Sequence, residues 1–197
     1  MMIKPYSSAC DQNRQPIERV LANHLGQRTR LLELSSGTGQ HAVYFSAALP
    51  QITWQPSDVE PAIAGIQAWV NEAALPNILT PIALNVDGDW PGSSYDVVFS
   101  ANAVHIMGWD SVLAMFKGID RVLERGGLLF LYGPFNYHGK FTSESNAGFD
   151  VWLKQRDPVS GVRDFEALDL LANQQGMHLL ADHEMPANNR TLVWEKD

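Results

Sequence analysis

Short apolar segments and longer amphipathic segments alternate along most of the chain. Five apolar segments are bounded by Gly, Pro, Asp or Ser, as buried strands usually are, and they cover residues 30–34, 52–55, 78–84, 95–101 and 128–132. Apolar residues at spacings of three and four predict helices over residues 16–25, 40–49, 60–74 and 109–123. This alternation predicts an α/β fold with parallel strands, right-handed crossovers and helices on both faces of one sheet.

The last part of the chain departs from this alternation. Residues 177–184 and 191–195 both have strand patterns, and the turn between them is short enough only for antiparallel neighbours. Residues 134–164 form a long connection with a short helix expected over 149–156. Long connections are typical of functional or mobile segments, so we expect this one on the substrate side of a site.

Composition narrows the class of protein. The 197 residues are 45% hydrophobic, which favours a single domain over residues 1–197, with residues 1–26 as an N-terminal helix and lid. The formal net charge of −8 disfavours a nucleic-acid partner. No apolar run reaches the ~20 residues that span a bilayer, and no signal peptide is evident. With Cys10 as its single cysteine, the chain is expected to be cytoplasmic; its oligomeric state stays open.

The sharpest local signal is a glycine-rich turn that follows the first predicted strand. The small residues Ser35, Gly37 and Gly39 let the backbone approach a ligand, and the next helix offers free N–H groups there. In open α/β sheets, nucleotide-like ligands bind at this edge. A tight turn without a ligand is the structural alternative.

Acidic residues follow the next two predicted strands. Asp58 is placed to accept hydrogen bonds from ribose hydroxyls, and Asp87 from an exocyclic adenine amine. Each acid alone is also typical of a helix cap or a turn. Together with the glycine-rich turn, the two acids favour a nucleotide site.

The identity of the cofactor needs further signals, because the pattern Gly-x-Gly-x-x-Ala also occurs in NAD(P)-binding dehydrogenases. Glu33 lies inside the first strand, where it can face a cationic amino group. The chain is short for a separate substrate domain, and its last strands are antiparallel. This combination resembles the class I S-adenosylmethionine (SAM)-dependent methyltransferases.

The resemblance narrows to an uncharacterised family, methyltransferase-like protein 26, and covers nearly the whole chain from Asn13. It is carried by residues 33–42, 54–58, 132–134, 156–158 with 163–164, and 185–189. It implies a seven-stranded, mostly parallel, Rossmann-like sheet with an antiparallel C-terminal strand, and it implies no substrate. Ser35 departs from the broader pattern, which prefers glycine.

The resemblance also implies roles in cofactor binding. It assigns Glu33 to the methionyl amino group, directly or through water, Gly37 and Gly39 to the backbone approach, Asp58 to ribose and Asp87 to adenine. Ser35 belongs to the same turn and is counted with these residues.

Connectivity adds two further candidates for the cofactor. The start of the N-terminal helix brings Arg14, with Asp11 and Asn13, to the same edge of the sheet. Asn102 follows the fourth strand, where it is placed to bind cofactor or substrate beside the transferred methyl group; capping of the next turn is the equal alternative.

Two residues are candidates for catalysis. His105 follows the fourth strand, and an imidazole there can take a proton from a hydroxyl or amine; a histidine bonded to backbone is the alternative. Tyr132 ends the fifth strand and, like Tyr137, is placed to orient a substrate or only to pack.

Two arginines of the long connection have two interpretations. Arg156 and Arg163 either clamp a carboxylate or phosphate, or pair with the adjacent Asp157 and Asp164. The histidines are scattered, so no metal site can be named.

The sequence therefore predicts a SAM-dependent methyltransferase acting on an unidentified small molecule. A catalytically inactive SAM-binding sensor or scaffold is the first alternative, and an NAD(P)-binding protein is the second.

Overall fold

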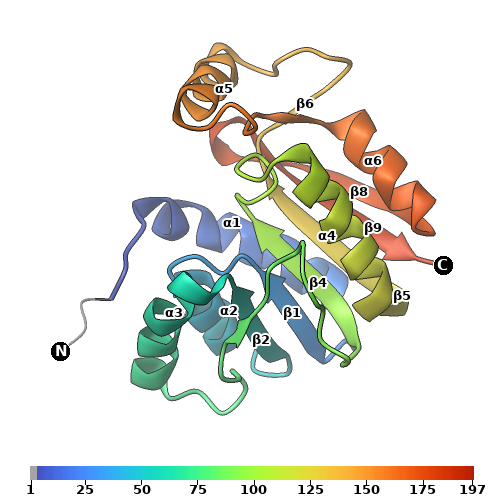
Figure 1. Cartoon of the computed structure of the whole chain (residues 1–197). Helices are drawn as coiled ribbons and strands as arrows, with labels where there is room; N and C mark the ends of the chain where they lie inside the picture. The colour runs from blue at the N-terminus through green and yellow to red at the C-terminus, as the bar shows by residue number, and fades with distance from the viewer. Residues whose placement is uncertain (1–3) are drawn as a thin grey trace.

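The computed structural model, which describes residues 4–197, has a main sheet of seven strands in the order β3-β2-β1-β4-β5-β9-β8 (Figure 1). Their bounds are β1 Arg30–Leu34, β2 Thr53–Asp58, β3 Ile82–Ala83, β4 Tyr95–Ala101, β5 Leu123–Gly133, β8 Met177–Met185 and β9 Asn189–Lys196. Strands β1 to β5 are parallel, and β9 is antiparallel to both of its neighbours. The predicted α/β fold with an antiparallel C-terminal strand is confirmed.

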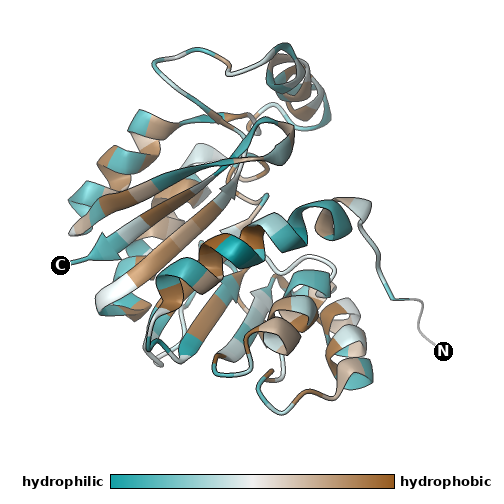
Figure 2. Ribbon diagram, turned by 180° about the vertical axis from the view of Figure 1, so that it is seen from behind, coloured by the Kyte–Doolittle hydropathy of each residue, from teal (hydrophilic) through white to brown (hydrophobic). Residues whose placement is uncertain are grey.

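Helices cover both faces of this sheet (Figure 1). Helices α1 Ser8–Leu25, α2 Gln40–Ala48 and α3 Glu60–Ala73 pack on one face, and α4 Trp109–Val122 and α6 Phe165–Gln174 pack on the other. Figure 2 shows α1 lying across the first face, over apolar strands. Helix α5 Glu144–Arg156 stands apart, beyond the carboxyl ends of the strands (Figure 1).

The core lies on both sides of the strands, which explains their nearly continuous apolar sequences. In β1, Leu31 packs with the α1–α3 layer, while Leu32 and Leu34 pack with the α4–α6 layer. On the α2 side, the rings of Phe45, Trp54 and Phe99 contact one another. Because helices cover both faces of the sheet, the loops at the ends of the strands are the segments that remain available to form a site.

Helix α1 begins at Ser8, well before the predicted start at residue 16, so Pro16 lies inside it. The two turns before the proline are held by contacts with α2: the Ser7 N–H donates to Gln40 Oε1, and Asn13 is hydrogen-bonded to His41. These tertiary bonds offset the backbone bond that proline cannot form.

Other element bounds shift for local reasons. The strand predicted over 78–84 is reduced to β3, because Ile78 makes only an isolated bridge to Trp54. The helix predicted over 149–156 starts earlier, where the Ser143 side chain caps it by accepting from the Asn146 N–H at 3.1 Å. A second, two-stranded sheet of β6 Phe135–Asn136 and β7 Arg163–Asp164 was not predicted.

None of the helices within residues 4–197 is both long and apolar enough to cross a membrane.

Candidate functional site

A cavity of about 1030 Å³ opens at the carboxyl ends of the central strands. One side, which we call the cofactor side after the prediction from the sequence, consists of Ser35 to Thr38, Asp58 and the start of α1. Its α5 side consists of the loop after β4, the cavity-facing residues of α5 and the turn between β8 and β9. The volume is at the upper end of the range for small-molecule sites, which is enough for two adjoining ligands.

The glycine-rich turn after β1 has a left-handed backbone at three positions. Ser35, Gly37 and Gly39 have φ angles of 56°, 59° and 87°, which explains why small residues occupy them. Ser35 and Gly37 border the cavity. Gly39 instead packs against α3: a Cβ at this position would lie 3.0 Å from the Ile66 Cα. The absence of a side chain at Gly39 therefore lets α3 pack closely against the turn.

The carboxylate of Asp58 joins the ends of β1 and β2. One oxygen accepts from the Gly37 N–H at 2.7 Å, and the other accepts from the Val59 N–H at 2.7 Å. Partial burial raises the pKa of Asp58, and these two N–H groups oppose that rise. Each oxygen keeps acceptor capacity for a ligand hydroxyl at the cavity wall.

Glu33 lies behind the wall of the cavity rather than in it. Its side chain accepts from Trp54 Nε1 at 2.9 Å, and the residue is only 2% exposed. Burial raises its pKa to about 7, against the hydrogen bonds from Trp54 and Ser36. The resemblance implied that Glu33 contacts the methionyl amino group either directly or through water. A side chain behind the cavity wall fits only the contact through water.

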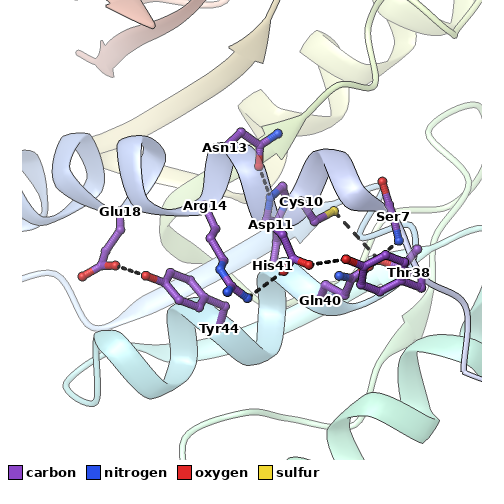
Figure 3. A network of polar contacts seen from close by, with 11 residues as sticks. Ser7, Cys10, Asp11, Asn13, Arg14, Glu18, Thr38, Gln40, His41 and Tyr44 are labelled. Carbon is purple, nitrogen blue, oxygen red and sulfur yellow. Dashed lines mark hydrogen bonds and ion pairs between the residues drawn. The ribbon is translucent and has the colours of Figure 1, made fainter. Parts of the chain in front are cut away.

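Besides Glu33 and Gly39, two further expected cofactor residues, Asp87 and Arg14, do not border the cavity. Asp87 is exposed and accepts from the Ser111 hydroxyl at 2.8 Å, so it serves the start of α4. Arg14 pairs with Asp11 at 2.8 Å and lies over the Tyr44 ring (Figure 3). The side chains of neighbouring helix residues point in directions about 100° apart. In α1, Arg14 points towards Tyr44 of α2, and the preceding residue, Asn13, borders the cavity.

Asn13 connects the start of α1 to α2 (Figure 3). Its Oδ1 lies 2.7 Å from His41 Nε2, and both residues are buried and border the cavity. Burial lowers the pKa of His41 to about 4, so the neutral ring donates to Asn13. The start of α1 is thereby fixed as a wall of the cofactor side.

The loop after β4 is held by the segment that precedes β7. Gly161 N–H donates to the His105 carbonyl at 2.9 Å, and the Ser160 hydroxyl donates to the Ile106 carbonyl at 2.7 Å. The Arg163 guanidinium donates to the carbonyls of Val104 and Met107. Arg163 thus stabilises this loop. This role differs from the two that were expected, which were to bind an anionic ligand or to pair with Asp164.

His105 is the buried imidazole that this loop presents at the cavity. It is 3% exposed, its Nδ1 has no hydrogen-bond partner within the described residues 4–197, and its ring meets the edge of Phe149 at 5.3 Å. Burial, together with the charges of Arg163 and Arg156, lowers its pKa to about 4. At neutral pH the ring is therefore uncharged.

Asn102 and Tyr132 border the cavity between its two sides. The Asn102 N–H donates to the Tyr132 carbonyl at 2.8 Å, and Asn102 has a left-handed φ of 56°. Burial raises the pKa of Tyr132, against hydrogen bonds from Asn13 and Asn189. The phenol therefore stays protonated at neutral pH and acts as a hydrogen-bonding group rather than a base.

Comparison with known families shows what the chain is related to. A family model described as "Protein of unknown function (DUF938)" matches residues 4–196. The chain belongs to this family.

Solved structures, two O-methyltransferases among them, resemble the DUF938 chain over more than nine-tenths of its length. An O-methyltransferase family protein from Burkholderia thailandensis is 14% identical with a TM-score of 0.82, covering 93% of this chain and 56% of that one. Mitomycin 7-O-methyltransferase MmcR is 13% identical with a TM-score of 0.79, covering 93% and 54%. PigF with SAH is 17% identical with a TM-score of 0.78, covering 92% and 55%. The DUF938 chain spans about half the length of these proteins and shares their methyltransferase fold.

Sequence reasoning placed the connection over residues 134–164 on the substrate side and named Arg156, but it missed the neighbouring side chains of α5. Phe149, Trp152 and Leu153 border the cavity together with Arg156. Their spacing of i, i+3, i+4 and i+7 defines one helix face, which was a usable signal. The turn after β8 also borders the cavity, with left-handed backbone at Ala187 and Asn188.

Proposed function

We propose that this DUF938 protein is a SAM-dependent methyltransferase that acts on a small molecule. The observation that carries the proposal is a single cavity with the Gly37–Asp58 pair on one side and, on the other, the neutral imidazole of His105, whose Nδ1 has no hydrogen-bond partner within residues 4–197. One side suits the cofactor, and the other suits an acceptor that must lose a proton. The finer likeness to methyltransferase-like protein 26 supports the same assignment.

The residues of the cofactor side fit SAM by their donor and acceptor chemistry. Ser35 and Gly37 admit the ligand to the backbone, and Asp58 accepts from the ribose hydroxyls. Glu33 reaches the amino group through water, and Asn102 lies near the methyl group. When bound, SAM supplies an electrophilic methyl group on a sulfonium.

The chain itself positions the acceptor and receives its proton. The imidazole of His105 takes the proton, while Tyr132 orients the acceptor by hydrogen bonding. The net charge of −8 and the absence of any basic stripe in the sequence favour a small molecule over nucleic acid, and the reduced single cysteine favours a cytoplasmic setting.

Calorimetric titration with S-adenosylhomocysteine (SAH), SAM, NADH and NADPH tests the cofactor. Binding of SAH and SAM without the dinucleotides is the expected result, and the reverse preference would overturn the proposal in favour of an NAD(P)-binding protein. Transfer of a tritiated methyl group to a metabolite extract then tests activity. Cofactor binding without any transfer would favour the inactive sensor or scaffold.

A further inference from the structure

The α5 side of the cavity contains an aromatic surface. The rings of Phe149 and Trp152 lie nearly parallel, 5.7 Å apart with an interplanar angle of 13°. Both rings border the cavity, and Trp152 is 51% exposed. A large aromatic side chain held at a cavity wall in this way offers a flat apolar surface on which a planar ligand can pack.

Arg156 supplies positive charge beside this surface. Within the part of the chain that the structure describes, it is the one Lys or Arg among the residues that border the cavity. Its guanidinium lies 5.2 Å from the centre of the Trp152 ring, which holds it over the aromatic surface.

The acids nearest in sequence to Arg156 have other partners. Asp150 pairs with Lys154 at 2.7 Å and accepts from the Val162 N–H at 2.9 Å. Asp157 accepts from the Val159 N–H at 3.2 Å. The planar donors of Arg156 are therefore available to an anion, and a guanidinium binds carboxylates in bidentate geometry.

His105 lies against the same surface. Its ring meets Phe149 edge-on at 5.3 Å, and the charge of Arg156 is close enough to oppose protonation of the imidazole. A ligand that spans from Arg156 to His105 would therefore rest on Phe149 and Trp152 along its length. The apolar residues Ile106 and Met107, which follow His105 in the loop after β4, also border the cavity.

We propose that the acceptor is a flat aromatic hydroxy acid, with its rings on Phe149 and Trp152, its carboxylate on Arg156 and its hydroxyl at His105. This inference rests on the proposed function and names the substrate class for it. The hydroxyl oxygen forms the new bond to the methyl carbon, and the carbon–sulfur bond breaks with its electron pair going to sulfur. The hydroxyl proton passes to the His105 imidazole.

Calorimetry with matched acids and esters tests the inference. The probes are 4-hydroxycinnamate and 3-hydroxy-2-naphthoate with their methyl esters, titrated into the full chain with and without saturating SAH. The wild type is expected to bind at least one acid about tenfold or more tighter than its ester, since one charge-assisted contact contributes about that factor. Arg156→Gln should remove the preference, and Arg156→Lys should restore part of it.

Two further variants separate the charge from the aromatic surface. Arg121→Gln, at an exposed arginine of α4, is the matched control and should keep the preference. Trp152→Ala should weaken acid and ester by a similar factor, because it removes packing area rather than charge.

The outcomes distinguish this inference from the proposed function. Equal binding of acid and ester by the wild type, or binding of neither probe acid to the SAH-loaded protein, overturns the inference and leaves the proposed function standing. Loss of SAH affinity in Arg156→Gln also overturns it, since Arg156 then serves the cofactor. If SAH does not bind but an acid does so through Arg156, the anion site stands and the proposed function fails.

Discussion

The Asp58 carboxylate accepts a hydrogen bond from the Gly37 N–H at 2.7 Å, which joins the turns after two neighbouring strands. The bond holds the glycine-rich turn in its left-handed conformation and aims the carboxylate at the cavity. The same carboxylate therefore organises the turn and presents the acceptor that the proposed cofactor requires.

Replacing Asp58 should remove cofactor binding. Two hydrogen bonds from ribose hydroxyls to a charged acceptor contribute about 1.5–3 kcal/mol each, so Asp58→Ala should weaken SAH by about 100-fold or more. Calorimetry with Asp89→Ala, at an exposed acid, provides the control. Circular dichroism should show that Asp58→Ala still folds. SAH affinity within a few-fold of the wild type would contradict the ribose assignment.

The affinity for SAH should depend on pH through Glu33. Its pKa is raised to about 7 by burial, whereas a cationic amino group favours the ionised form. Below pH 7 binding must first remove a proton, so the affinity should fall by up to about tenfold per pH unit. Titrations between pH 5.5 and pH 8 check this, and Glu33→Gln should flatten the profile. An unchanged slope in that variant would place the titrating group elsewhere.

His105→Gln should lower methyl transfer by about 10² to 10⁴-fold, the usual contribution of a general base, and should leave SAH affinity unchanged. The ring accepts a proton only when neutral, and its pKa is lowered to about 4. At SAM concentrations that saturate the protein at each pH, the rate in the wild type should therefore persist as the pH falls from 7 to about 5 and decline near 4. Single-turnover transfer of tritiated methyl measures the rate. Full activity in His105→Gln would rule out proton transfer to this ring.

Protein stability should fall with acidity because of His41. Its pKa is lowered from 6.5 to about 4 in the folded protein, so the unfolded chain binds one more proton between these values. The contribution of His41 to stability is therefore lost as the pH falls from about 6.5 towards 4. Denaturant unfolding should show a smaller slope in His41→Gln than in the wild type.

Substitutions at Ser35 should follow its backbone conformation. The φ of 56° is readily adopted by glycine and strained for a β-branched residue. Ser35→Gly should keep stability within about 1 kcal/mol and keep SAH binding, whereas Ser35→Val should lose about 1–3 kcal/mol. Urea unfolding of the two variants measures the difference. Equal stability of the two would show that the turn has a different conformation in solution.

Local sequence determined much of the fold. The strands Arg30–Leu34 and Tyr95–Ala101 have the bounds that their apolar patterns predicted, and the short turn before β9 required an antiparallel pair. These features depend on hydrophobic period, turn residues and loop length, which act over a few neighbouring residues. The positions of Asp58 and His105 at one edge followed from parallel connectivity alone.

Tertiary structure decided which side chains share the cavity. Arg14 and Asn13 are adjacent in sequence, and only the packing of α1 on α2 turns Asn13 inward. Trp54 of the neighbouring strand β2 donates a hydrogen bond to the Glu33 carboxylate, which holds that side chain behind the cavity wall. The contacts of α5 with the loop after β4 likewise join distant segments. A sequence pattern specifies the face of an element, while its partners are set by how the elements pack.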